Sequence, residues 1–298
     1  MKKLFVIAAG ALALVACSQH KQGSAASDMA QEAETDTVTA GRFDVKDLNG
    51  YKLHIYLTAD QMGDASYIIE GNDSLVTLEQ PLFKVNGAAF DKYLASLGKP
   101  VAHRIADFHL GNTGEATIVM PEGMPDVVKG EAYSGMMNHF ADEYGDAIEP
   151  LPTGATVEIP FDSTVVLGGV PFTFYKGASN DFPGADILIG KDVVYSHWAP
   201  EKAHINSLYA SNPEGVDARL AELEQTLSTG ATLFVGGHGS PATAEDVKFR
   251  IAYLGKVKEL LASQDTAEKF ASALIEAYPG LPGEDGVKAL AESLYSGR

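Results

Sequence analysis

Two short segments of the chain carry residues that could bind a metal ion or move a proton. One covers residues 106–114, with Asp107 and His109 two residues apart, and the other covers residues 234–241, with His238 between glycines. Each segment follows an apolar run typical of a strand, and ligands of α/β proteins often bind in loops after strands. Glycines beside His238 allow close approach of the backbone to a ligand. A tight turn with an incidental histidine is the plainer explanation.

The elements expected around these segments alternate between strands and helices. Short apolar runs predict strands at residues 51–57, 66–70, 74–79, 101–106, 156–160, 163–167, 172–175, 187–189, 193–195 and 231–235. Helical spacing of apolar residues predicts helices at residues 88–97, 136–148, 216–227, 243–262, 265–278 and 287–295. Thr243 with Asp246, and Asp265 with Glu268, have the spacing of helix-capping pairs. This order favours an α/β fold of four layers, αββα, in which helices cover both outer faces of two sheets.

The start of the chain resembles a bacterial lipoprotein signal. Two lysines precede an apolar run that is too short to span a bilayer and that ends in Leu14-Val15-Ala16-Cys17. We expect residues 1–16 to be removed and Cys17 to be lipidated, which would anchor the protein to the cell envelope, on the periplasmic or outer-membrane side. A plain signal peptide with an incidental cysteine is the alternative.

The remaining sequence predicts three further parts. Residues 17–42 combine the lipidated cysteine with small and polar residues that cannot form a core, so we interpret them as a disordered tether. Residues 43–262 form the predicted domain, and residues 263–298 a helical C-terminal extension packed on it. With a single cysteine the chain cannot form an internal disulfide or a thiolate metal site. The formal net charge of −18 argues against nucleic-acid binding, because such a surface repels phosphates.

Several of these segments together resemble the metallo-β-lactamase superfamily. Gly236-Gly237-His238-Gly239 before a helix is similar to that family's late Gly-His-Gly loop, where the histidine binds the second metal. Residues 67–79 resemble the family's paired first strands, with Glu79 near the position of a characteristic aspartate. Residues 177–184 resemble a Gly-His-x-Pro-Gly turn with Asp181 on the histidine; a gapped alignment puts Ser179 there instead.

The family's main ligand motif, Thr-His-x-His-x-Asp-His, is depleted in this chain. If His109 takes the second histidine position, Asp107 takes the first, Gly111 the aspartate and Asn112 the last histidine. Glycine has no side chain and the asparagine amide is a poor ligand, so the usual two-metal site is not expected. His197 or Trp198 stands where the metal-bridging aspartate is expected.

The resemblance therefore implies two different functions. The candidate metal ligands that remain are Asp107, His109, Asp181, His197 and His238. They could hold one divalent cation, zinc, iron or manganese, in a hydrolase acting on a small ester, amide or thioester. Alternatively no metal binds, and the protein is a catalytically inactive relative that binds a small ligand or a protein at the former active site. In either case we expect contact with a membrane through the lipid anchor only.

Overall fold

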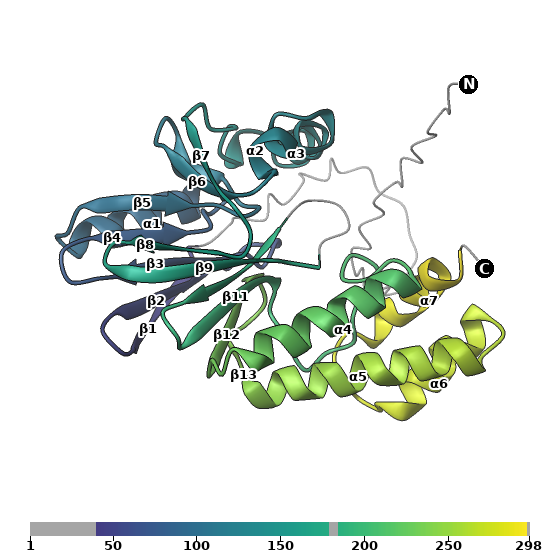
Figure 1. The fold of residues 1–298 in the computed structure, drawn as a ribbon. Coiled ribbons are helices and arrows are strands. Elements are labelled where there is room, and N and C mark those ends of the chain that lie inside the picture. Colours follow the sequence, from purple (N-terminus) through teal and green to yellow (C-terminus); the bar gives the residue numbers. More distant parts are fainter. Residues whose placement is uncertain (1–39, 179–183, 297–298) are drawn as a thin grey trace, which may run out of the picture. The chain divides into compact units, whose positions relative to one another are not determined.

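The structure is a computed structural model that describes residues 40–178 and 184–296. Cys17 and Asp181 lie outside these residues. Two β-sheets pack face to face, and helices lie on their outer faces (Figure 1). The four-layer αββα fold expected from the sequence is confirmed. None of the described helices is long and apolar enough to cross a membrane.

The first sheet has seven strands that follow one another in chain order. They are β1 (Arg42–Asp47), β2 (Lys52–Leu57), β3 (Ala65–Glu70), β4 (Leu75–Leu78), β5 (Val101–Ile105), β6 (Ile118–Pro121) and β7 (Thr156–Ile159). Neighbouring strands from β1 to β4 are antiparallel, and those from β4 to β7 are parallel. The parallel half places the loop after β5, which contains His109, at one end of the sheet.

The second sheet has six strands, in the order β13-β12-β11-β10-β9-β8. They are β8 (Ser163–Leu167), β9 (Val170–Lys176), β10 (Ala185–Ile189), β11 (Val193–Trp198), β12 (Leu233–His238) and β13 (Ala242–Thr243). Only the pair β11 and β12 is parallel among these strands. Because the two strands run the same way, their C-terminal residues lie side by side, with Trp198 opposite His238.

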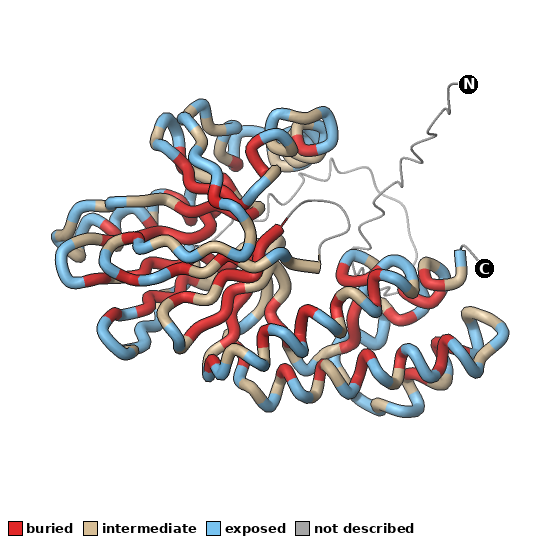
Figure 2. Tube along the Cα trace, in the orientation of Figure 1, coloured by how far each residue is buried: buried red, intermediate tan, exposed pale blue. Residues whose placement is uncertain are grey.

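The core between the sheets follows from alternation along the strands. In β11, Val193 and Tyr195 face the other sheet, whereas Val194 faces the helices. In β3, Tyr67 faces inward and Ile68 faces the helix side of its own sheet. Successive side chains of a strand point to opposite faces, so strands buried on both sides must be apolar throughout. The tube in Figure 2 is buried along inner strands of the two sheets, such as β3 and β10.

The helices cover the two outer faces and extend one end of the molecule. On the side of the first sheet are α1 (Lys84–Ser96), α2 (Met124–Val128) and α3 (Glu131–Tyr144), with short 3-10 turns η1 (Gly111–Thr113) and η2 (Gly145–Ala147). On the side of the second sheet are α4 (Pro213–Ser228), α5 (Ala244–Ser263), α6 (Ala267–Ala277), η3 (Glu284–Gly286) and α7 (Val287–Tyr295).

One of the two predicted helix caps is confirmed and the other is wrong. Thr243 and Asp246 form the expected reciprocal capping box at the start of α5. At the start of α6, however, the capping residue is Thr266, whose hydroxyl accepts from the backbone N–H of Lys269. Asp265 lies one residue too early and forms an ion pair with the Lys269 ammonium at 2.7 Å instead.

Candidate metal centre

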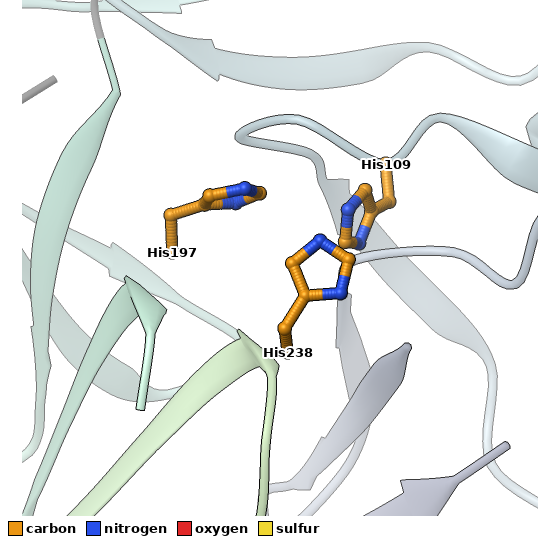
Figure 3. A group of neighbouring side chains, drawn as sticks. All are labelled: His109, His197 and His238. Atoms are coloured by element: carbon orange, nitrogen blue, oxygen red, sulfur yellow. The ribbon is translucent and has the colours of Figure 1, made fainter. Parts of the chain in front are cut away.

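Three histidines from three separate elements meet at one end of the two sheets. His109 follows β5, His197 lies in β11 and His238 ends β12. One nitrogen from each ring can be chosen so that the three lie within 4.8 Å of one another. Figure 3 shows the three rings converging on one point. We call these residues the histidine cluster.

Strand geometry explains why these side chains converge. Val193, Tyr195 and His197 alternate along β11 and share the face that points between the sheets, so His197 is the outermost member of an inward-facing row. His238 comes from the neighbouring parallel strand. Of the two candidates for the bridging position, His197 joins the cluster, and Trp198 stacks on the His238 ring with a centroid distance of 4.7 Å.

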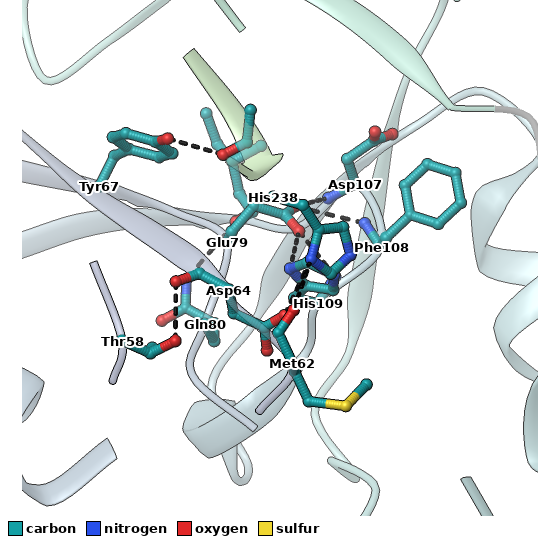
Figure 4. Close-up of polar contacts among 12 residues, drawn as sticks. Thr58, Met62, Asp64, Tyr67, Glu79, Gln80, Asp107, Phe108, His109 and His238 are labelled. Carbon is teal, nitrogen blue, oxygen red and sulfur yellow. Dashed lines mark hydrogen bonds and ion pairs between the residues drawn. The ribbon is translucent and has the colours of Figure 1, made fainter. Parts of the chain in front are cut away.

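Glu79 holds the loop that carries His109. Its carboxylate is fully buried and accepts hydrogen bonds from the backbone N–H groups of Asp107 at 2.6 Å and His109 at 2.9 Å. It also lies 3.0 Å from Nδ1 of His109. Glu79 has a positive φ of 58°, a backbone conformation that is unusual outside glycine and that persists only where surrounding contacts enforce it. One carboxylate thus fixes both the loop and the orientation of the His109 ring (Figure 4).

Asp64 orients the ring of His238, as Glu79 orients the ring of His109. This buried residue precedes β3, and its Oδ1 lies 3.2 Å from Nδ1 of His238. The carbonyl oxygen of Met62 lies at the same distance from that nitrogen. A ring whose Nδ1 is engaged in this way presents Nε2 to the cluster. Carboxylates and carbonyls in this position orient metal-binding histidines and make them better ligands.

The three histidines of the cluster differ in the direction in which their pKa is shifted. Burial works against protonation of His109, but the carboxylates of Asp64 and Glu79 outweigh it and raise the pKa of His109 to about 9. Burial and the nearby charge of His109 lower the pKa of His238 to about 4. Burial, with the charges of His238 and His109, holds the pKa of His197 well below its ordinary value. Two of the three imidazoles are therefore neutral at neutral pH, which is the form that binds metals, and a cation bound in the cluster would displace the proton from His109.

Comparison with known proteins identifies the fold. No protein-family model and no curated protein matches the chain. Among solved structures, a metallo-β-lactamase family protein from Thermus thermophilus is 18% identical with a TM-score of 0.54, and the match covers 83% of this chain and 91% of that one. A β-lactamase domain protein from Burkholderia ambifaria is 15% identical with a TM-score of 0.55, covering 87% and 88%. The chain has the metallo-β-lactamase fold.

A third similar structure belongs to a larger enzyme. It is an inverting sec-alkylsulfatase from Pseudomonas sp., 15% identical with a TM-score of 0.57. The match covers 81% of this chain and 48% of the alkylsulfatase, so this chain spans about half the length of that enzyme. At such identities the likeness concerns the fold, and the chemistry has to be argued from the site.

The histidine cluster fits a divalent cation. Three imidazole nitrogens with further positions left open are typical of catalytic zinc sites, and neutral histidine also suits iron and other first-row metals. Nδ1 of His197 is buried and makes no hydrogen bond to any described residue, which suits an atom that binds a cation. Glu79 and Asp64 supply the supporting contacts. Within the described residues this is the one group of three or more candidate ligands that converges.

Two further metal ligands were predicted in this metallo-β-lactamase fold, Asp107 and Asp181. Asp107 is buried, but its Oδ1 accepts from the backbone N–H of Ala185 at 2.9 Å, and its carboxylate is not part of the converging group. Burial and the charge of Glu79 raise the pKa of Asp107. A ligand role for Asp107 stays a prediction, and so does one for Asp181, which lies outside the described residues.

Gly111 and Asn112 stand at the two positions where this chain lacks a ligand of the family motif. The Asn112 amide donates to the carboxylate of Asp91 at 2.8 Å, on the side of α1. A side chain at Gly111 would have its Cβ only 2.1 Å from the carbonyl oxygen of Pro81. Neither position therefore contributes a ligand to the histidine cluster.

Aromatic rings and two cavities border the cluster. Phe108 packs on His197 with a centroid distance of 3.9 Å. A hollow of only about 10 Å³ beside His197 is lined by Asp107 and Asp186, among others. A larger cavity of about 490 Å³ has Asp64 in its wall, together with small residues such as Gly63 and Ser240. The larger cavity thus lies against the residue that supports His238.

Proposed function

We propose that this protein is a single-metal hydrolase that acts on a small ester, amide or thioester. The observation that carries the proposal is the convergence of His109, His197 and His238 within 4.8 Å, each from a different element. A divalent cation held there would supply Lewis acidity and a nucleophile derived from water near neutral pH. The ligand set is all nitrogen, which among zinc, iron and manganese suits manganese least.

The residues around the cluster have defined tasks in this proposal. Glu79 and Asp64 hold the rings of His109 and His238 so that one nitrogen of each faces the cation. Phe108 and Trp198 pack on the rings of His197 and His238 and limit the access of bulk water. Supporting the reaction class, the structural relatives carry the names of a β-lactamase family and of an alkylsulfatase.

Buried carboxylates surround the histidine cluster. The carboxylates of Glu79, Asp64 and Asp107 are all buried close to the cluster. Arg219, a cation near His197, is already paired with Glu222 at 3.0 Å. A cation bound in the cluster would offset part of this negative charge.

Metal analysis and turnover test the proposal together. The purified full-length protein, loaded with zinc and dialysed, is expected to retain about one ion per chain by elemental analysis and to hydrolyse p-nitrophenyl acetate or a phenyl thioester. His109→Ala, His197→Ala and His238→Ala are each expected to lose the ion and the activity. His139→Ala is the control, because that side chain is 54% exposed on α3. Absence of bound metal in the loaded wild type would refute the proposal.

An inactive ligand-binding protein is the second candidate. It is favoured by the narrow hollow of about 10 Å³ beside His197, which leaves little room for a substrate there. The same experiment separates the two candidates. Stoichiometric metal without turnover of any ester, amide or thioester favours the binding protein, whereas turnover that depends on His109 excludes it.

We also propose that the protein is an envelope lipoprotein anchored through Cys17. The support is the sequence Leu14-Val15-Ala16-Cys17 after a short apolar run. The full-length chain, expressed in a bacterial host with radiolabelled palmitate, is expected to carry label and to sediment with membranes. Cys17→Ala should carry no label, and equal labelling of both chains would contradict the anchor.

A further inference from the structure

A buried tyrosine beside the histidine cluster has no assigned task. Tyr195 precedes His197 by two residues in β11, so both side chains point between the sheets. The residue is fully buried, and its hydroxyl lies near the Glu79 carboxylate but has no partner in hydrogen-bond geometry among the described residues. Most buried hydroxyls in folded proteins have a partner, so an unpaired one needs an explanation.

The Tyr195 hydroxyl lies close to Gly237. A Cβ atom built on Gly237 would lie 3.0 Å from Cε1 of His109, 3.2 Å from the Tyr195 hydroxyl and 3.3 Å from Nδ1 of His197. One small volume is therefore bordered by two rings of the cluster and by the phenol oxygen. Because position 237 has no side chain, the three groups can pack closely around it.

The neighbouring tyrosine has an ordinary structural contact. Tyr67 packs edge-on against Tyr195 with a centroid distance of 6.3 Å. Unlike Tyr195, it donates a hydrogen bond from its hydroxyl to the carbonyl oxygen of Gly236 at 2.6 Å. Two buried tyrosines thus lie side by side, one with its hydrogen bond satisfied within the protein and one with its hydroxyl beside the cluster.

We propose that the Tyr195 hydroxyl donates a hydrogen bond to the oxygen atom of the substrate that reacts at the histidine cluster. The proposal deepens the hydrolase function and rests on it. A neutral phenol is suited to this task, because a preorganised donor in a dry site stabilises charge that develops on a carbonyl oxygen.

Two conservative variants separate this role from a structural one. Tyr195→Phe is expected to lower kcat about 10²- to 10³-fold, the usual effect of losing one such donor, with little change in metal content. Its midpoint of thermal unfolding should change little, because the removed hydroxyl has no partner in hydrogen-bond geometry. Tyr67→Phe is the matched control; it should unfold at a lower temperature and keep kcat within about threefold, since its lost bond is structural.

A binding measurement tests the same donor without turnover. The full-length protein is loaded with Co²⁺ and titrated with azide while the visible spectrum of the cobalt is recorded. Tyr195→Phe is expected to raise the azide Kd about tenfold or more, the loss of one hydrogen bond to a charged group, whereas Tyr67→Phe should leave it within about twofold. Equal azide Kd in wild type and Tyr195→Phe would overturn the role of Tyr195 alone. A wild type that binds no cobalt would overturn the metal site and this role together.

Discussion

The carboxylate of Asp64 lies 3.2 Å from Nδ1 of His238, and the backbones of the two residues also form an isolated β-bridge. Asp64 belongs to the turn before β3 of the first sheet, and His238 ends β12 of the second. The contact therefore joins the two sheets at the histidine cluster. It fixes which nitrogen of His238 faces a cation.

Replacement of Asp64 by Asn is expected to weaken zinc binding about 10- to 100-fold, because the amide offers no charge to the His238 ring. The zinc Kd can be measured by competition with a chromophoric chelator. Asp44→Asn is the control, since Asp44 lies in the same sheet with its side chain 58% exposed. An unchanged Kd in Asp64→Asn would mean that Asp64 does not orient the ligand.

Replacement of Glu79 by Gln is expected to destabilise the whole fold. An amide retains one acceptor oxygen and places an NH₂ group where backbone N–H groups of the 107–109 loop now donate. Buried groups left without partners cost about 1–3 kcal/mol each, so we expect the free energy of unfolding in urea to fall by about 2–4 kcal/mol. Glu276→Gln, at an exposed position of α6, should change it by less than about 0.5 kcal/mol.

Restoration of the family's aspartate at Gly111 is expected to fail. Gly111 has a positive φ of 33°, and its Cβ would clash with the Pro81 carbonyl oxygen. We expect Gly111→Asp to cost about 3 kcal/mol or more and to add no second metal ion by elemental analysis. Gly114→Asp is the matched control, with a φ of 60° but no atom within 4 Å of its Cβ, and should cost about 1 kcal/mol. Two ions per chain in Gly111→Asp would contradict this prediction.

The stability of the fold should fall in acid partly through Glu70. Its carboxylate bonds the Lys99 ammonium at 2.8 Å and the His54 ring at 2.9 Å, and the Lys99 contact first, then His54, hold the pKa of Glu70 below its ordinary value of 4.5. A lowered pKa means that the stabilisation is complete well above pH 4.5 and is lost as the pH falls through the folded pKa.

The Glu70 contribution can be isolated by comparison with Glu70→Gln. We expect the variant to be less stable than wild type by about 1 kcal/mol at pH 7, because the ion pair with Lys99 remains partly in contact with water. The difference should shrink as the pH is lowered toward about 3. A difference in unfolding free energy that does not change over this pH range would refute the role of this carboxylate.

The order of elements could be predicted because most strands and helices have strong apolar patterns. The helix over residues 287–295 agrees with α7, and the strand over residues 163–167 agrees with β8. Three strands were not expected, and one of them, β13 (Ala242–Thr243), has only two residues. β1 (Arg42–Asp47) is mostly exposed and alternates charged residues, and β6 (Ile118–Pro121) has only four residues and ends in a proline. Their pairing depends on neighbouring strands rather than on local sequence.

The site could be predicted only in part. His109 and His238 stand out in their loops, but sequence gives no distance between them, and their approach depends on the packing of two sheets. The sequence left His197 and Trp198 as alternatives for the bridging position. Tyr195 faces the core between the sheets, and side chains alternate along a strand, so it is His197 that points the same way. Nothing in the sequence points to Asp64, because an aspartate after a glycine between two strands is an ordinary turn residue.

The histidine cluster draws ligands from both halves of the sandwich, since His109 follows a strand of the first sheet and the other two histidines belong to the second. A bound ion would act as a clamp that has to be released before the sheets can separate. Ligand binding to the native state alone adds RT ln(1 + [L]/Kd) to stability, which is about 2.7 kcal/mol at a hundredfold excess over Kd. The supply of metal in the surrounding compartment would then govern how long each molecule resists proteases there.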